Sequence, residues 1–121
     1  MEKINKVLLV EDDETTIFIS KMALKKVGIE DVSEAVNGRI ACDHLKNECS
    51  DLIFLDLNMP VMDGWEFLEE KKETGFCKDI KIVILSSSTH PEDKKKATSY
   101  DSVIAYIEKP LTIEKVEGLM R

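Results

Sequence analysis

Asp51–Gly64 reads DLIFLDLNMPVMDG, and this stretch places a carboxylate directly after a short apolar run. The run Leu52–Leu55 is entirely apolar, and its short length between polar residues is typical of a buried strand. Asp56 comes next, and a carboxylate at the end of a buried segment costs free energy unless something there requires its charge. The stretch therefore predicts a buried strand that ends at a functional aspartate.

Other short runs rich in valine and isoleucine have the same character, and longer amphipathic segments lie between them. The predicted strands are Val7–Val10, Val32–Val36, Leu52–Leu55, Ile82–Leu85 and Val103–Ile107. The predicted helices are Thr15–Val27, Arg39–Lys46, Gly64–Glu73, Glu92–Tyr100 and Ile113–Met120. This alternation predicts an α/β fold, a parallel sheet with helices on both faces. Five strands fit the doubly wound, flavodoxin-like order 2-1-3-4-5, in which the first and third strands are neighbours.

The bulk composition limits the possible functions. The chain has 121 residues, which fits one domain over residues 1–121. Its net charge of −7 argues against binding to nucleic acid or to an anionic membrane surface. No apolar run is long enough for a signal peptide or a membrane span, so we expect a cytoplasmic protein. Cys42, Cys49 and Cys77 are odd in number without C-x-x-C spacing, so we expect reduced structural thiols.

Polar side chains follow four of the predicted strands, at the point where each strand ends. Because the carboxyl ends of parallel strands share one edge of the sheet, we expect these side chains to gather beside the crevice between the first and third strands. They are Glu11, Asp12 and Asp13 after the first strand, Asp56 after the third, Ser86–Thr89 after the fourth and Lys109 after the fifth.

Crowded carboxylates repel one another, and two unit charges about 4 Å apart cost about 4 kcal/mol at an effective dielectric near 20. Either a raised pKa or a bound cation relieves this repulsion. Carboxylates without a nearby histidine or cysteine favour magnesium over zinc or copper. Lys109 adds a cation and Ser86 a hydroxyl donor, so Asp56 has the surroundings that a phosphoryl acceptor needs.

Each of these residues also has a plainer interpretation when it is taken alone. Asp13 is a candidate helix N-cap, and Glu11 and Asp12 have the same possibility. Lys109 before a proline is often only a solvated charge, and Ser86 after a strand is often a turn residue. Their convergence on one edge of the sheet favours the functional interpretation, because the plainer ones would have to coincide by chance.

Five segments, in this order and spacing, resemble the receiver domain of two-component response regulators. The resemblance covers essentially the whole chain and is closest to the single-domain, chemotaxis-regulator-like form. The segments are VLLVEDDE at Val7–Glu14, EAVNG at Glu34–Gly38, DLIFLDLNMPVMDG at Asp51–Gly64, ILSSS at Ile84–Ser88 and YIEKP at Tyr106–Pro110.

The resemblance implies a role for each matching residue of the acidic cluster. Asp56 matches the aspartate that is phosphorylated. Glu11 and Asp12 match the acidic pair that binds magnesium together with Asp56, and Asn58 is expected to offer its backbone carbonyl to the metal. Asn58 and, farther along the chain, Ser88 are our hypotheses for the side chains that set the rate at which the acyl phosphate is hydrolysed.

The resemblance also implies a switch. Ser86 matches the hydroxyl that bonds the phosphoryl group. Lys109 matches the lysine that contacts phosphate, and its bond to Pro110 is expected to be cis. Tyr106 matches an aromatic residue that rotates inward when the hydroxyl moves, although a half-buried strand tyrosine is the plainer interpretation. A histidine kinase or phosphotransfer protein would supply the phosphoryl group, and a downstream protein would bind the face formed by helix 4, strand 5 and helix 5.

Such a protein is not an enzyme in the usual sense, because it only catalyses its own phosphorylation and dephosphorylation.

One departure from the family is Asp101-Ser102, which stands where a glycine is usual after helix 4. A second feature is Lys94–Lys96, either a solvated helix face or a partner contact. A helix 4 with few apolar residues would also be easy to shift.

Three alternatives remain open at this point. The chain could be a receiver excised from a hybrid kinase or a larger regulator, although a start at Met1 favours a stand-alone protein. A magnesium-dependent aspartyl phosphatase would need a second aspartate where Asn58 stands. A flavin-binding module shares the fold, but the carboxylates would repel the flavin phosphate.

Overall fold

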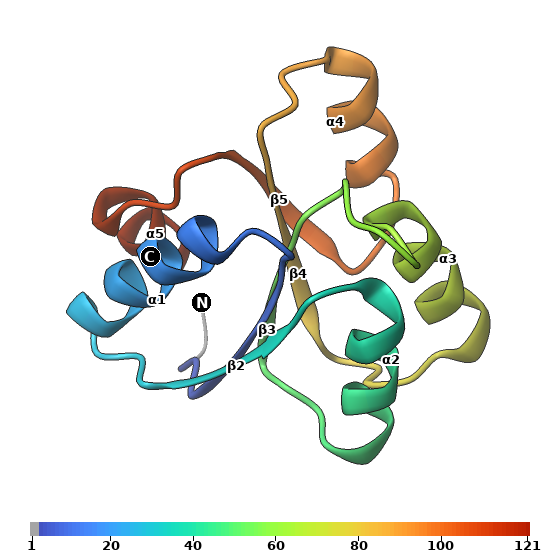
Figure 1. Cartoon of the computed structure of the whole chain (residues 1–121), viewed down its shortest axis with the longest axis horizontal. Helices are drawn as coiled ribbons and strands as arrows, with labels where there is room; N and C mark the ends of the chain where they lie inside the picture. The colour runs from blue at the N-terminus through green and yellow to red at the C-terminus, as the bar shows by residue number, and fades with distance from the viewer. Residues whose placement is uncertain (1–2) are drawn as a thin grey trace.

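Parallel strands in the spatial order β2-β1-β3-β4-β5 form the centre of the computed structural model, which describes residues 3–121. The strands are β1 (Lys6–Val10), β2 (Asp31–Ala35), β3 (Leu52–Leu55), β4 (Lys81–Ser86) and β5 (Val103–Glu108). The helices are α1 (Glu14–Lys26), α2 (Gly38–Asn47), α3 (Gly64–Thr74), α4 (Pro91–Thr98) and α5 (Ile113–Met120). Helices α1 and α5 cover one face of the sheet, and α2, α3 and α4 cover the other (Figure 1). The predicted α/β fold and its strand order are confirmed.

Element boundaries lie within two residues of those predicted. β2 ends at Ala35 rather than at Val36, whose side chain is turned to solvent. α4 ends at Thr98 because the backbone N–H groups of Ser99 and Tyr100 each bond a carbonyl three residues back, which tightens the chain into a turn. No helix within residues 3–121 has the length and apolar character needed to cross a membrane.

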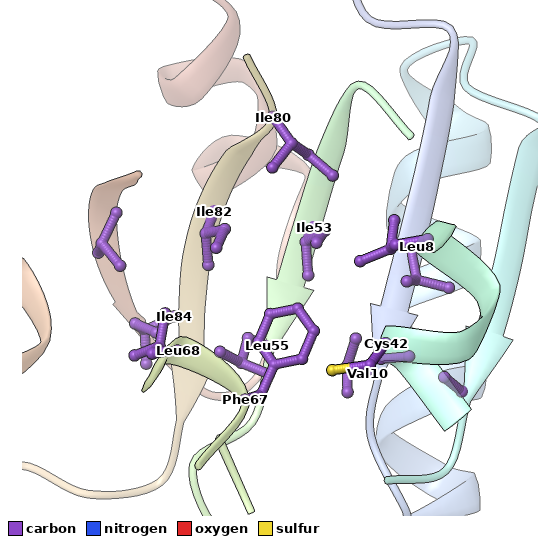
Figure 2. Packing of buried hydrophobic residues seen from close by; sticks show 14 of the residues in the cluster. Leu8, Val10, Cys42, Ile53, Leu55, Phe67, Leu68, Ile80, Ile82 and Ile84 are labelled. Atoms are coloured by element: carbon purple, nitrogen blue, oxygen red, sulfur yellow. The ribbon is translucent and has the colours of Figure 1, made fainter. Parts of the chain in front are cut away.

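The central strands β1, β3 and β4 are apolar on both faces because helices pack against both faces of the sheet. Successive residues of β1 therefore divide between two core layers. Leu8 belongs to the layer under α2 and α3, whereas Leu9 belongs to the layer under α1 and α5. Figure 2 shows the first layer, where Leu55 of β3 lies beside Phe67 of α3, with Cys42 of α2 close by. This packing leaves only the strand ends free for polar chemistry.

The start of α3 rests directly on the backbone of Asp56. A Cβ atom on Gly64 would lie 2.5 Å from the Asp56 carbonyl oxygen, so only glycine allows this close approach. Asp63 and Glu66 form a capping box, in which each side chain bonds the backbone N–H of the other residue. The turn after β3 therefore has a fixed course, and it holds Asp56 at the edge of the sheet.

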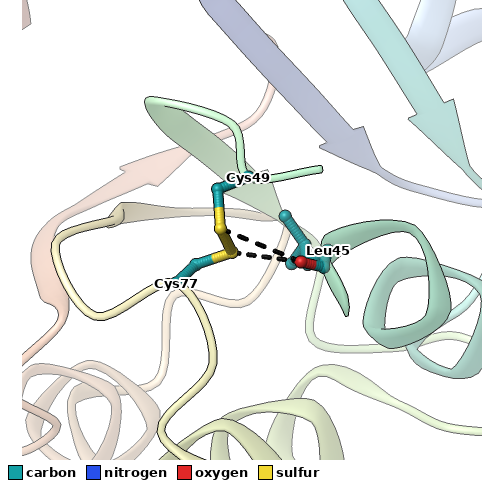
Figure 3. Close-up of a disulfide and its surroundings, with 3 residues drawn as sticks. All are labelled: Leu45, Cys49 and Cys77. Atoms are coloured by element: carbon teal, nitrogen blue, oxygen red, sulfur yellow. Dashed lines mark hydrogen bonds between the residues drawn. A yellow bond between two sulfur atoms is a disulfide. The ribbon is translucent and has the colours of Figure 1, made fainter. Parts of the chain in front are cut away.

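The expectation that all three cysteines are reduced is wrong for two of them. Cys49 and Cys77 form a disulfide, although they are 28 residues apart in sequence (Figure 3). They lie in the loops that precede β3 and β4, and these strands are hydrogen-bonded neighbours, so both loops reach the amino edge of the sheet together. Cysteine spacing along the chain does not show this proximity. Cys42 is a free, buried thiol, as expected.

Candidate functional site

Glu11, Asp12 and Asp56 lie together at the carboxyl edge of the sheet. Each offers a carboxylate oxygen, and these oxygens lie within 4.8 Å of one another. Glu11 and Asp56 are buried, at 4% and 5% exposure, whereas Asp12 is exposed. The backbone N–H of Glu11 donates to the Ala35 carbonyl at 2.9 Å, and that of Asp56 donates to the Val10 carbonyl at 3.0 Å. Hydrogen bonds that continue the sheet ladder thus hold both carboxylates just beyond their strands.

Lys109 bridges the two buried carboxylates. Its Nζ lies 2.8 Å from Glu11 Oε1 and 3.5 Å from Asp56 Oδ1. Its backbone N–H donates to the Ser86 carbonyl at 2.9 Å, and its bond to Pro110 is cis, as the resemblance implied. The contact with Glu11 Oε1 is an ion pair without hydrogen-bond alignment, and no other described group donates to that buried oxygen. Glu11 Oε1 therefore keeps unused capacity to bind a ligand.

Burial is the main cause of the pKa shifts of Glu11 and Asp56. It raises the pKa of Glu11 to about 7, against the opposing effect of Lys109, and the charge of Asp56 adds to the rise. Burial also raises the pKa of Asp56, while Lys109 and the backbone N–H of Asn58 oppose that rise. A divalent cation would favour the ionised forms of both groups. Three carboxylates whose oxygens lie within 4.8 Å of one another fit a hard cation such as Mg²⁺.

Ser86 ends β4 next to this cluster. β3 and β4 are paired with Leu55 opposite Ile84, so Ser86 lies close to the level of Asp56 along the sheet. Its side chain is fully buried, and its Oγ accepts a hydrogen bond from the backbone N–H of Ser88 at 3.0 Å. A hydroxyl in this position can exchange its bond to the loop for a bond to a ligand on Asp56.

Ser88 and Tyr106 are joined to each other rather than to the acidic cluster. The Tyr106 hydroxyl donates to the Ser88 carbonyl oxygen at 3.0 Å, so the half-buried ring is fastened to the loop between β4 and α4. The Ser88 hydroxyl donates to Asp93 Oδ2 at 2.6 Å. Asp93 was not anticipated from the sequence, where its place in the first turn after Pro91 was the only available signal.

The side chains of Asn58 and Asp13 do not join the carboxylates of the cluster. The Asn58 side chain is exposed, and its backbone N–H bonds the Asp56 carboxylate. Asp13 caps α1 by accepting from the backbone N–H of Thr16 at 3.0 Å, so its plainer interpretation is confirmed. Asp13 therefore belongs to the helix rather than to the cluster.

Helix α4 is attached weakly to the rest of the fold. Ala97 is its one buried residue, and the Lys96 ammonium group lies 4.4 Å above the ring of Trp65 in α3. The remaining lysines of Lys94–Lys96 are exposed. The family's missing glycine causes no left-handed strain, because neither Asp101 nor Ser102, which stand in its place, has a positive φ.

Comparison with known proteins shows the family to which the chain is similar. A family model described as the response regulator receiver domain matches residues 7–121. The two-component response regulator ORR41 of Oryza sativa subsp. japonica is 35% identical over 122 residues, which cover 94% of this chain and 90% of that protein. A two-component response regulator from Cytophaga hutchinsonii has a crystal structure that superposes with a TM-score of 0.89 at 30% identity, covering 98% of this chain and 96% of that one.

A third relative is much longer than this chain. The hybrid signal transduction histidine kinase K of Dictyostelium discoideum is 31% identical over 120 residues, which are 93% of this chain. The same residues are only 10% of that kinase. Chains of this kind therefore occur both as most of a small protein and as a small part of a large one.

Proposed function

The chain belongs to the response regulator receiver domain family, a family of two-component signalling proteins, and we propose that residues 1–121 form one receiver whose phosphorylated residue is Asp56. The observation that supports this assignment best is the pairing of a buried Asp56 with the Lys109 ammonium group, 3.5 Å away. A nucleophilic carboxylate next to a fixed cation is suited to receive a phosphoryl group. Asp56 would accept it from phosphohistidine of a histidine kinase or a histidine phosphotransfer protein.

Magnesium is the cofactor that we propose for this site. Glu11, Asp12, Asp56 and the backbone carbonyl of Asn58 would hold it. When bound, the metal would offset the negative charge of the carboxylates and of the incoming phosphoryl oxygens. Burial raises the pKa values of Glu11 and Asp56 although Lys109 is close to both, which supports a site where a further cation would stabilise the ionised carboxylates.

The transfer step follows from the position of Asp56. An oxygen of its carboxylate attacks the phosphorus atom, the bond from phosphorus to the donor histidine nitrogen breaks, and the electron pair of that bond remains on the imidazole. The product is an acyl phosphate on Asp56. Lys109, which already contacts Asp56 and Glu11, would neutralise charge on the phosphoryl oxygens. Hydrolysis of the acyl phosphate by water returns Asp56, and Asn58 and Ser88 remain our candidates for setting its rate.

Phosphorylation would be transmitted through Ser86. Moving its hydroxyl toward the phosphoryl oxygens breaks the 3.0 Å hydrogen bond from the Ser88 backbone to Ser86 Oγ. Ser88 also holds Tyr106 through its carbonyl oxygen, so the ring is free to turn when the loop moves. The phosphoryl group thereby shifts an existing equilibrium between two conformations by its different contacts in each.

Exposed apolar side chains support two docking faces. Phe18 and Met22 on α1 are 64% and 49% exposed, and α1 begins directly after the acidic cluster, which suits the phosphoryl donor. Ile104 on β5 and Ile113 on α5 are 43% and 39% exposed on the α4–β5–α5 side, which suits a downstream protein. We propose these two contacts, and a cytoplasmic location where both partners would meet the chain.

Two settings fit this function. In one, the chain is a stand-alone regulator that signals by binding its target, as its extensive match to ORR41 supports. In the other, it is the receiver of a hybrid kinase, as the match to a tenth of kinase K supports. The chemistry at Asp56 is the same in both.

Intact mass after incubation with a small acyl-phosphate donor tests the proposal. Wild type should gain one phosphoryl group in the presence of Mg²⁺ and none with a chelator. Asp56→Asn should gain nothing, whereas the control Asp43→Asn, an exposed position on α2, should behave as wild type. A phosphoryl group on Asp56→Asn, or a gain that chelation leaves unchanged, would contradict the assignment of the site or of the metal.

A further inference from the structure

We propose that Cys49 and Cys77 form a reversible redox site, which small dithiols open and small disulfides close. The pair lies at the amino edge of the sheet, in the loops before β3 and β4. Asp56 and Ser86 lie at the opposite ends of the same two strands. The inference does not depend on the phosphoryl chemistry, which uses no cysteine.

Access separates these two cysteines from the third. Cys49 is exposed and Cys77 is partly exposed, whereas Cys42 is fully buried in the core. Burial also raises the pKa of Cys42 to about 12, which keeps it in the unreactive thiol form. A small thiol in solution can therefore reach the pair Cys49–Cys77 and not Cys42.

The disulfide lines a cavity that can admit such a reagent. The cavity has a volume of about 650 Å³, and Lys3, Lys78 and Lys81 also line it. Positive charge near a sulfur atom stabilises a thiolate, both on an attacking reagent and on a departing cysteine. Asp51 and Asp79 line the same cavity, so three lysines face two aspartates there and positive charge is in excess by one.

The fold can accommodate the reduced pair as well. The Leu45 carbonyl oxygen lies 3.3 Å from Cys77 Sγ and 3.8 Å from Cys49 Sγ (Figure 3). Leu45 is in the last turn of α2, where carbonyl groups lack partners within the helix, so a free thiol can donate to this oxygen. β3 and β4 are joined by their own ladder, which starts where Leu52 lies opposite Lys81. Opening the disulfide therefore leaves both loops anchored.

Reduction is a two-electron exchange that balances without other reagents. A thiolate of the dithiol attacks the sulfur of Cys49, the more exposed of the two residues, the bond between the two cysteine sulfurs breaks, and Cys77 leaves as a thiolate that takes a proton from water. The second thiolate of the reagent then attacks its own sulfur in the mixed disulfide and releases Cys49. The dithiol ends as a cyclic disulfide, and the protein holds two thiols. Closure reverses these steps with a small disulfide as the oxidant.

Counting reactive thiols by mass tests the proposal. The full chain, purified without reductant, is equilibrated under native conditions with reduced dithiothreitol or with oxidised glutathione. It is then quenched in acid, unfolded, alkylated with N-ethylmaleimide and weighed. The oxidised protein should carry one adduct, on Cys42, and the reduced protein three. Adding oxidised glutathione to the reduced protein, after removal of the dithiol, should restore one adduct, with the far-ultraviolet circular dichroism unchanged throughout.

Variants separate the possible outcomes. Cys42→Ala should change the counts from one and three to none and two, which assigns the redox pair without altering it. Cys49→Ser should give two adducts with the dithiol, whereas with oxidised glutathione its unpaired Cys77 should hold a glutathione mixed disulfide and only Cys42 should carry an adduct. Three adducts in wild type after oxidation would show that no disulfide forms. One adduct after native reduction would show a permanent structural bond, and loss of the circular dichroism on reduction would show that the fold requires it. Each of these three results would overturn the proposal.

Discussion

The Tyr106 hydroxyl donates a hydrogen bond to the Ser88 carbonyl oxygen at 3.0 Å, and this bond ties β5 to the loop between β4 and α4. Ser88 is held on two further sides, because its backbone N–H donates to Ser86 Oγ and its hydroxyl donates to Asp93. One residue thus connects the candidate switch hydroxyl, the aromatic ring and the start of α4. A displacement of Ser86 has a direct route to the face that we propose for a downstream partner.

Tyr106→Phe should loosen this loop without disturbing the core. Removing the hydroxyl deletes one neutral hydrogen bond, which costs about 1 kcal/mol in the free energy of unfolding. The backbone amides of residues 87–90 should exchange hydrogen faster, as measured by hydrogen–deuterium exchange. The control is Tyr100→Phe, which removes the bond from the Tyr100 hydroxyl, just after α4, to Glu69 of α3. Equal protection of residues 87–90 in wild type and Tyr106→Phe would contradict the role of this bond.

The fold could be predicted because its signals are local. Short apolar runs between amphipathic segments are sufficient for five strands and five helices, and the strand order follows from rules on parallel crossovers. The grouping of Glu11, Asp12, Asp56 and Lys109 could be anticipated for the same reason, since each follows the end of a strand. Their individual contacts, such as the Lys109 bridge, were not predictable.

The remaining features depend on how loops approach one another. The hydrogen bond from Ser88 to Asp93 depends on the path of the loop between β4 and α4, which no periodicity describes. The disulfide joins residues that are 28 apart in sequence, so cysteine spacing along the chain does not indicate it. Cys49 lies three residues before β3 and Cys77 four residues before β4, so the predicted strand order already placed them at one edge of the sheet.

Glu11 should make stability depend on pH when no divalent cation is present. Its pKa is about 7 in the folded protein, against an ordinary value of 4.5, so the folded state holds a proton that the unfolded state has released. This contribution to stability is fully present below pH 4.5 and is lost as pH rises through 7. The free energy of unfolding should fall by about 3 kcal/mol across this window at about 1.4 kcal/mol per pH unit.

Urea unfolding in chelator at a series of pH values measures this effect. Glu11→Gln cannot lose a proton, so its curve should be flatter than that of wild type between pH 4.5 and 7. Glu117→Gln, an exposed position on α5, is the matched control and should follow wild type. If Glu11→Gln and wild type differ by a constant amount at every pH, the buried carboxyl does not titrate as expected.

Asp12→Asn should stabilise the protein in chelator and reduce its response to Mg²⁺. The substitution removes one of three crowded carboxylates, and relief of one exposed repulsion is worth about 1 kcal/mol. Thermal unfolding in chelator should therefore give a higher midpoint for Asp12→Asn than for wild type. Added Mg²⁺ should raise the midpoint of wild type by more than that of Asp12→Asn. Asp43→Asn is the control, and an equal response of all three proteins would place the metal elsewhere.

Loss of the Cys49–Cys77 disulfide should lower stability by an amount set by the loop that it closes. The two residues are 28 apart, and restricting a loop of that length in the unfolded chain is worth about 3.5 kcal/mol in the chain-entropy model. The double variant Cys49→Ser/Cys77→Ser should be less stable than oxidised wild type by about this amount in urea unfolding. With a reductant present, wild type should lose this extra stability and the double variant should not change.

Cys42→Ala is the control, because it keeps the disulfide. It should lose less stability than the double variant, and a reductant should still lower its stability. A difference between wild type and the double variant that persists in reductant would mean that packing of the sulfur atoms, rather than the covalent link, is responsible.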